Sequence, residues 1–324
     1  MRAFLYGICN TAPQMPLTMT HALRPHLALL LCNTIWALDY PFYVLVLGRY
    51  IQPLPMVTAA LLITALLSLI PRLWESPERV ETRDKWIFAG AALLVAIVRK
   101  LLMMYGLSFT SPIDGAIIST IGPLLILVLS VAIGRDHFTR RKVIGCLLGM
   151  GGAIAVVMTS GSSQHAHSDL TGNLLLFGAS CTTALYMVFF KGTIARYKVT
   201  TVMRWIYCLG ALMLLPFGAE SLLKTDFGAL HGRIAFATAF VIFVPTYLPN
   251  LMLNFALKRI SSTITGIYSY LQPLLAILIS VAMGLDKLHA DTLIFGLIIG
   301  LGVWLVVGAY HAPTHPDVTI HQQS

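Results

Sequence analysis

The chain has 324 residues, of which 57% are apolar and only 11% charged, with a formal net charge of +9. A soluble domain carries about 25% charged residues, so this composition excludes most soluble classes and indicates a membrane protein. The basic residues lie between long apolar segments rather than in one patch, so we expect lipid around the chain and no nucleic-acid partner.

Apolar segments of roughly 20 residues, the length that crosses a bilayer as a helix, recur along the chain. They predict ten transmembrane helices at 26–47, 54–73, 86–107, 112–133, 143–160, 172–190, 201–219, 234–256, 262–283 and 292–310. Residues 1–25 and 311–324 are more polar, and we expect a disordered N-terminal lead and a disordered C-terminal tail.

The distribution of basic residues predicts the orientation of these helices. With the N-terminus inside the cell, sixteen of the 22 Lys and Arg residues fall on the cytoplasmic side. Such a bias in short loops orients membrane proteins. We therefore expect a multi-pass protein of the bacterial plasma membrane with both termini in the cytoplasm.

An internal repeat organises the chain. Leu107–Asp136 matches Leu257–Asp286 at twelve positions without a gap, and a GxxxGxG spacing that begins at Gly145 recurs from Gly296. A repeat of about half the chain predicts two related halves.

The halves correspond to residues 26–160 and 172–310. Each holds five spans, and because five is odd the second half enters the membrane from the opposite side. The predicted fold is an all-α polytopic membrane protein of ten transmembrane helices in two inverted five-helix repeats. Inverted repeats are typical of secondary transporters, with a binding site between the halves. A scaffold or a channel is the alternative.

The repeated helices carry a family resemblance. They read SPIDGAIISTIGPLLILVLSVAIG and SSTITGIYSYLQPLLAILISVAMG, with central Pro123 and Pro273, and glycine-rich helices follow both. With Trp36 and Ala37 in the first span, residues 26 to 310 resemble an EamA-type member of the drug/metabolite transporter superfamily. The resemblance implies export or exchange of small metabolites over a wide range of substrates, while the inverted halves themselves favour alternating access.

The chain departs from that family at the ends of the fourth and ninth helices. The family usually has Gly-Glu there, whereas this chain has Asp136 and Asp286, each one residue after an inserted Arg135 or Leu285. The acidic character of both positions is retained.

Charged residues within the spans are candidate site residues. Asp39 falls near the middle of the first span, and Arg99 and Lys100 fall within the third. A charge at the bilayer centre costs roughly 2.5–3.5 kcal/mol on insertion scales, so it faces protein or water and has a partner. Asp39 and Arg99 either form a structural ion pair or bind the substrate and respond to a coupling proton.

Helical periodicity separates the two basic residues of the third span. Arg99 shares a stripe of small residues that is expected to face other helices. Lys100 shares its face with Leu93 and Ile97 and is expected to face lipid. Arg99 is therefore the better candidate.

The eighth span, VPTYLPNLMLNFAL, places two prolines and two asparagines at membrane depth. Proline leaves a carbonyl without its helical hydrogen bond, and that carbonyl can bind a ligand if it lines a cavity. An ordinary kink is the alternative. Asn250 corresponds to Lys100 in the 150-residue register and is predicted to face Arg99 across the repeat, so it joins the candidates.

Polar and aromatic residues of mid-span position complete the predicted site. Such residues are either interfacial anchors or lining groups of a wet cavity. The predicted substrate-binding residues are Asp39, Arg99, Trp36, Tyr40, Tyr186, Asn250, Tyr268 and Gln272.

One carboxylate and one guanidinium in a cavity suit a zwitterion, so amino acids or related metabolites are the first expected substrates. A phosphorylated sugar would need several converging basic groups and ranks second.

No span clearly contains a histidine, and the sequence has no HExxH, GxSxG or GK[ST] motif. We therefore expect neither an enzyme nor ATP-driven transport, and no cofactor or metal. The loop histidines His165 and His167 are too few for a metal site. A membrane enzyme and a channel remain the rival classes. The expected partners are a small-molecule substrate, a coupling proton and the bilayer, in a monomer or homodimer.

Overall fold

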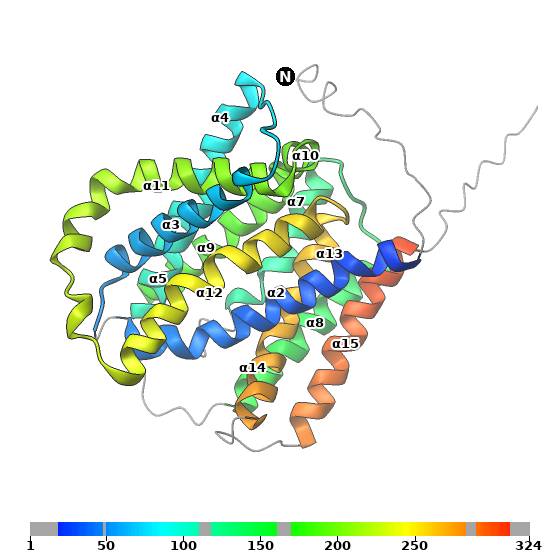
Figure 1. The fold of residues 1–324 in the computed structure, drawn as a ribbon. Coiled ribbons are helices and arrows are strands. Elements are labelled where there is room, and N and C mark those ends of the chain that lie inside the picture. Colours follow the sequence, from blue (N-terminus) through cyan, green and yellow to red (C-terminus); the bar gives the residue numbers. More distant parts are fainter. Residues whose placement is uncertain (1–18, 48–49, 110–117, 161–169, 283–289, 312–324) are drawn as a thin grey trace, which may run out of the picture.

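A computed structural model of the chain describes residues 19–47, 50–109, 118–160, 170–282 and 290–311. The described residues form a helical bundle without a β-strand among them (Figure 1). The helical segments are α2 (Met19–Val46), α3 (Pro53–Leu69), η1 (Ile70–Leu73), α4 (Thr82–Ala91), η2 (Ala92–Val98), α5 (Arg99–Phe109), α7 (Gly122–Ala132), α8 (Arg140–Ser160), α9 (Leu170–Phe189), α10 (Lys191–Arg196), α11 (Val199–Lys224), η3 (Phe227–Ala229), α12 (Gly232–Leu257), α13 (Ser262–Ile267), η4 (Tyr268–Tyr270), α14 (Leu271–Ala282) and α15 (Ala290–His311).

Within the described residues, six helical stretches are long and apolar enough to cross a membrane. They are Pro53–Leu73, Thr82–Phe109, Leu170–Phe189, Val199–Lys224, Gly232–Leu257 and Leu293–Tyr310. The other four predicted spans fall on α2, α7, α8 and the broken helix α13 to α14. The chain is thus a nearly all-helical membrane protein, and the number of ten spans stays a prediction.

The first helix differs from its prediction. Helix α2 begins at Met19, so residues 19–25, which were expected in the disordered lead, are helical. That expectation rested on the more polar composition of residues 1–25. Residues 19–25 nevertheless include helix formers such as Ala22 and Leu23, which extend α2 toward the N-terminus. The expected tail at 312–324 lies outside the described residues.

Helices α8 and α15, which correspond to each other in the two repeats, pack through glycines. A Cβ atom added to Gly145 would lie 2.7 Å from the carbonyl oxygen of Gly302 and equally close to Val306. A Cβ added to Gly152 would lie 2.9 Å from Ile299. Gly145, near the start of α8, thus meets residues 302 and 306, whereas Gly152, further along α8, meets residue 299. The contacts move toward the start of α15 as α8 proceeds, so the two helices run antiparallel (Figure 1).

The second helices of the two repeats, α3 and α11, have the same relation. Thr58 packs against Gly218, and the side chains of Ser68 and Cys208 lie 3.8 Å apart. Corresponding helices that pack antiparallel around one axis are what inverted repeats predict, because parallel repeats would leave them parallel.

The other helices also pack in pairs that are equivalent between the two halves. Helix α2 packs on α12 and α14. Its counterpart α9 packs on α5 and α7, which are the counterparts of α12 and α14. The described part of the bundle therefore has an approximate twofold relation between its halves.

The third span contains a stretch of π-helix. Residues Ala92–Val98 form this wider turn between α4 and α5. Because a π-helix closes i→i+5 hydrogen bonds, it shifts the faces of the helix that follows relative to ordinary α-helical periodicity. The shift precedes Arg99 and Lys100 directly, so it decides where both side chains point.

Large apolar side chains on the outside of the bundle include Phe217, Leu297 and Trp304, each about two-thirds or more exposed. An apolar outer surface suits a protein surrounded by lipid. In that environment helices associate through close packing and hydrogen bonds rather than the hydrophobic effect. The glycine contacts of α8 with α15 supply such packing.

Candidate functional site

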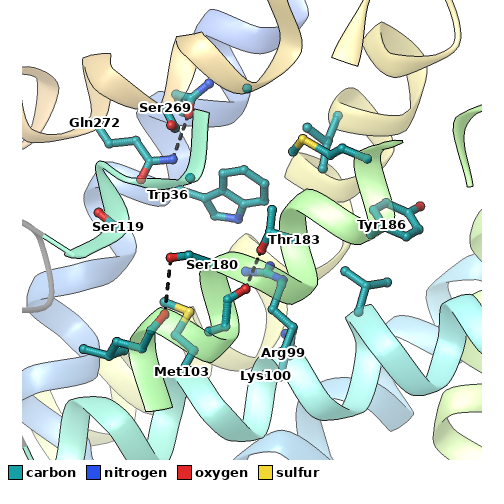
Figure 2. A pocket seen from close by; sticks show the side chains of 18 of the residues that line it. Trp36, Arg99, Lys100, Met103, Ser119, Ser180, Thr183, Tyr186, Ser269 and Gln272 are labelled. Carbon is teal, nitrogen blue, oxygen red and sulfur yellow. Dashed lines mark hydrogen bonds between the residues drawn. The ribbon is translucent and has the colours of Figure 1, made fainter. Parts of the chain in front are cut away.

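A cavity of about 200 Å³ lies between the two halves (Figure 2). Its walls come from α2, η2, α5 and α7 of the first half and from α9, α12, α13, η4 and α14 of the second. The lining mixes apolar residues with a few polar and charged groups, which is the usual character of a small-molecule site.

The lining residues repeat with the 150-residue offset of the sequence. Seven pairs separated by 150 positions line the cavity with both members: Asn33 and Thr183, Trp36 and Tyr186, Val95 and Pro245, Lys100 and Asn250, Met103 and Leu253, Ser119 and Ser269, Gly122 and Gln272. The cavity therefore lies on the axis that relates the halves. Its two sides have equivalent positions but different chemistry.

Arg99 is the first residue of α5, where the π-helical stretch ends. Its Nε atom is buried and has no hydrogen-bond partner among the described residues. The guanidinium carbon lies 6.0 Å from the centre of the Trp36 ring, within range of a cation–π interaction. A buried donor without a partner costs free energy, so it marks a place where a ligand acceptor could bind.

Lys100 corrects the sequence-based expectation of a lipid-facing side chain. It is 7% exposed and lines the cavity together with Met103, Met104 and Leu107. Leu93, which α-helical periodicity places on the same face, is 53% exposed. The π-helical stretch between them causes the difference, because it rotates α5 relative to α4.

The prolines of α12 expose backbone acceptors to α2. Pro249 has no N–H to donate to the carbonyl of Pro245, and the indole Nε1 of Trp36 donates to that oxygen at 3.3 Å. The thiol of Cys32 donates to the carbonyl of Pro249, also at 3.3 Å. The kinked segment thus uses its freed carbonyl to hold Trp36 at the cavity wall.

A ladder of polar side chains follows one face of α12. The amide of Asn250 donates to the carbonyl of Thr246 at 2.7 Å, and that of Asn254 donates to the carbonyl of Asn250 at 2.8 Å. The hydroxyl of the fully buried Tyr186 donates to Oδ1 of Asn254 at 2.6 Å. This ladder anchors Tyr186 of α9 to α12.

Other polar lining groups are also held by the protein. Gln272 donates to Oδ1 of Asn33 at 2.7 Å, which links α14 to α2 (Figure 2). The hydroxyls of Ser180 and Thr183 donate to carbonyls of their own helix at 3.2 and 2.9 Å. Sequence reasoning did not select Asn33, Ser180 or Thr183, although the 150-residue offset links Asn33 and Thr183 to each other.

Five of the eight predicted site residues line the cavity: Trp36, Arg99, Tyr186, Asn250 and Gln272. Tyr268 is absent from the lining, and its hydroxyl lies 2.8 Å from Nδ1 of His26 instead. Tyr268 is the first residue of the short 3₁₀ segment η4, and this segment interrupts the continuous α-helix that the sequence predicted. Asp39 and Tyr40 belong to α2, but their side chains lie outside the described part of the structure.

The described residues contain no group of three or more His, Cys, Asp or Glu side chains that could hold a metal ion. His165 and His167 lie outside the described ranges. The described part of the cavity lining offers hydrogen-bonding side chains together with the cationic groups of Arg99 and Lys100.

A bundle of apolar helices with a partly polar cavity between two related halves is the architecture of a membrane transporter. The model of the EamA-like transporter family matches residues 23–158 and 170–308, and the chain belongs to this family. The predicted family resemblance is thereby confirmed.

Curated relatives agree with this assignment. The uncharacterized transporter YyaM of Bacillus subtilis is 26% identical over 216 residues, which cover 66% of this chain and 70% of the relative. An uncharacterized transporter of Archaeoglobus fulgidus is 20% identical over 289 residues, 89% of this chain and 99% of that protein. A solved crystal structure matches with a TM-score of 0.71 at 16% identity, over 91% of this chain and 99% of that one, which supports the fold alone.

Proposed function

We propose that this protein is a secondary transporter that exports or exchanges small metabolites by alternating access. The substrate binds in the cavity on the axis between the halves, and rocking of one half against the other opens that cavity to each face in turn. The observation that carries the proposal is the set of seven lining pairs separated by 150 residues. A site on the symmetry axis is equally placed for access from both sides.

The first proposed substrate class is zwitterionic, as in amino acids. Arg99 takes the substrate carboxylate, for which its planar guanidinium offers a two-pronged set of donors. Its buried Nε without a described partner supports this role. Asp39, on α2 like Trp36, is proposed to receive the ammonium group and to respond to a coupling proton.

A phosphorylated metabolite is the second candidate, favoured by one observation. The phosphorylated class ranked below the zwitterionic class because Lys100 was expected to face lipid. In the structure Lys100 lines the cavity beside Arg99. Two adjacent cations suit a group with more than one negative charge better than a single carboxylate does.

Counterflow in proteoliposomes tests the proposed function. Vesicles with the purified protein are preloaded with an unlabelled amino acid, sugar phosphate or organic amine, and entry of the labelled compound is followed. A carrier gives saturable uptake that the internal substrate accelerates. Uptake that neither saturates nor responds to internal substrate would indicate a channel, and acceleration by sugar phosphates alone would select the second substrate class.

Orientation in the membrane is a separate part of the proposal, with cytoplasmic termini in the bacterial plasma membrane. The exposed Arg79, between η1 and α4, and the exposed Lys224, at the C-terminal end of α11, are predicted on opposite faces. In intact cells, an impermeant thiol reagent should label Lys224→Cys and leave Arg79→Cys unmodified. The reverse pattern would overturn the orientation.

A further inference from the structure

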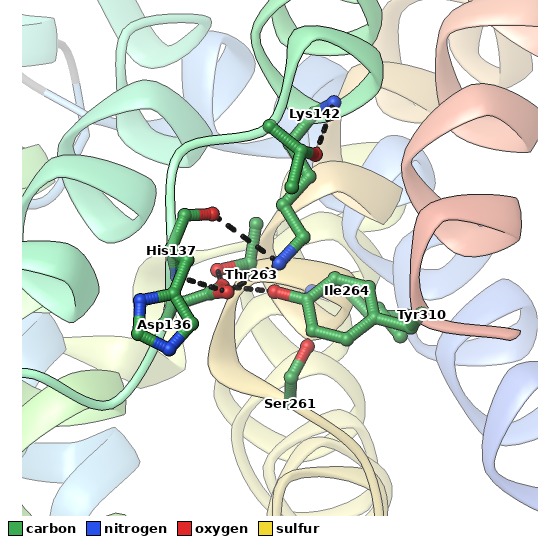
Figure 3. A network of polar contacts seen from close by, with 8 residues as sticks. Asp136, His137, Lys142, Ser261, Thr263, Ile264 and Tyr310 are labelled. Carbon is green, nitrogen blue, oxygen red and sulfur yellow. Dashed lines mark hydrogen bonds and ion pairs between the residues drawn. The ribbon is translucent and has the colours of Figure 1, made fainter. Parts of the chain in front are cut away.

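A second cluster of buried polar groups lies at one end of the bundle, around Asp136 (Figure 3). The carboxylate is 7% exposed. Its Oδ1 accepts the backbone N–H of His137 at 2.8 Å and pairs with the ammonium of Lys142. Its Oδ2 accepts the hydroxyl of Thr263 at 2.8 Å and that of Tyr310. Lys142 also lies 4.0 Å from the centre of the Tyr310 ring.

The partners of this carboxylate come from both halves of the molecule. Asp136 follows α7 and Lys142 is on α8, so the ion pair lies within the first half. Thr263 is on α13 and Tyr310 is on α15, so both hydroxyls come from the second half. The charged pair can move as one unit, whereas the bonds that cross between the halves have neutral donors.

Other hydrogen bonds cross between the halves at the same end. The guanidinium of Arg135 donates to the carbonyl of Val188. Asp84 of α4 accepts from Arg196 at 2.8 Å and from the hydroxyl of Tyr197 at 2.6 Å. At this end of the described structure the halves are therefore joined by several polar bonds.

The opposite end has a different kind of contact between the halves. There the aromatic ring of Phe42 on α2 packs against Phe236 and Phe240 on α12, with ring centres 5.9 and 4.5 Å apart. Aromatic packing tolerates sliding better than a set of directional hydrogen bonds does.

We propose that the hydrogen bonds from Thr263 and Tyr310 to Asp136 form a latch that holds this end closed and is released when the cavity opens toward it. Release separates two hydroxyls from the carboxylate while the Asp136–Lys142 pair stays intact on its own half. A buried carboxylate that loses hydrogen bonds is costly, but Asp136 keeps Lys142 as its partner and water replaces the two hydroxyls as the end opens. The latch rests on the alternating-access movement proposed above.

The test removes the two bonds from Thr263 and Tyr310 to Asp136, and it leaves every charge and the other bonds between the halves in place. The double variant Thr263→Val and Tyr310→Phe deletes both hydroxyls with little change of shape. Thr225→Val is the matched control, because that hydroxyl donates to the carbonyl of Ser221, four residues earlier in the same half, at 2.8 Å. If the double variant fails to fold, Tyr310→Phe alone keeps the ring and removes one bond.

The readout is the distance across each end, measured by pulsed electron paramagnetic resonance in the full chain with its five native cysteines replaced. Spin labels at Phe138→Cys and Arg259→Cys report the latched end, since both positions are exposed and lie on different halves. Labels at Tyr50→Cys and Arg233→Cys report the opposite end, where both positions are also exposed and neither belongs to the aromatic contact.

In the double variant the ratio of long to short distances at 138–259 should rise by about tenfold, while distances at 50–233 shorten. The control should match the unmodified chain. Unchanged distances together with a lower unfolding temperature would overturn the latch and make the network purely structural. A single distance population at both ends of the unmodified chain, with or without substrate, would instead contradict the proposed alternating access.

Discussion

The central cavity and the Asp136 network are both polar regions inside an apolar bundle, but their charged groups differ in how fully the protein satisfies their hydrogen bonds. In the network the buried carboxylate has four donors from three helices and a loop. In the cavity the buried Nε of Arg99 has no partner among the described residues. A buried charge whose hydrogen bonds are all satisfied by the protein serves to join the elements that bond to it. A buried donor left open is suited to a ligand.

The same contrast applies to the neutral polar groups. Around the cavity, Asn250, Ser180 and Thr183 donate to carbonyls of their own helices. At the network, hydroxyls from one half bond to a carboxylate of the other. These three cavity groups are thus held by their own helices, while the cavity bonds that cross between the halves, from Trp36 to Pro245 and from Gln272 to Asn33, both involve α2.

The largest expected effect comes from removing the charges of Asp39 and Arg99 together. If Asp39 and Arg99 bind substrate, the double change Asp39→Asn and Arg99→Gln should lower transport efficiency by about 30-fold or more, as expected for losing hydrogen-bonded charge pairs. Because both partners are removed, no buried charge is left uncompensated. Counterflow is compared with Arg204→Gln, on α11 away from the cavity lining. Normal transport by the double variant would reduce the two residues to a structural pair.

A smaller loss is expected from Trp36→Phe. The change keeps an aromatic ring near Arg99 but removes the indole N–H that bonds the carbonyl of Pro245. The ring is then no longer fixed at the cavity wall beside Arg99, and because such a bond contributes on the order of 1 kcal/mol to positioning, substrate affinity should fall by about fivefold. Competition against labelled substrate measures it. Unchanged affinity would show that the α12 kink does not need this bond.

Lys100→Gln separates the two substrate classes. For a zwitterion bound through Arg99, the change should alter counterflow by less than about threefold, because one guanidinium satisfies one carboxylate. A loss of more than about tenfold that is specific for phosphorylated compounds would contradict the first class and favour the second. Lys198→Gln, at the N-terminus of α11, is the control for a general loss of positive charge.

The smallest effect is expected from pH acting on the network. Burial alone would raise the pKa of Asp136, but hydrogen bonds from Lys142, Tyr310, Thr263 and the backbone of His137 outweigh it and hold the pKa below its usual value. A lowered pKa gives a contribution to stability that is present above about pH 4 and is lost only in stronger acid. Distances at 138–259 should therefore be the same at pH 5 and pH 8. Opening of this end at pH 5 would contradict this interpretation.

The sequence was sufficient for the features that depend on hydropathy and repetition. The apolar segments located the helices, and the repeat predicted a cavity between halves that holds Trp36, Tyr186 and Gln272. These features could be predicted because they depend only on the length of the apolar segments and on the 150-residue offset.

Features that depend on local departures from the α-helix were not predictable. Lys100 was misplaced because the π-helical stretch before it changes the face of α5, and no residue in Ala92–Val98 signals that change. Tyr268 was misplaced because η4 interrupts its helix. The partners of Asp136 come from positions up to 174 residues away, and only the packing of the halves brings Tyr310 beside it.

The most direct test of the central claim is the accessibility of the cavity itself. Ser180, on the lining of α9, is changed to Cys in a chain without other cysteines, and impermeant thiol reagents are applied to each face of oriented membranes. Labelling from both faces, with protection by the substrate identified in counterflow, is the predicted result. Labelling from one face only, or labelling that saturating substrate does not slow, would contradict a shared binding cavity that opens alternately to the two sides.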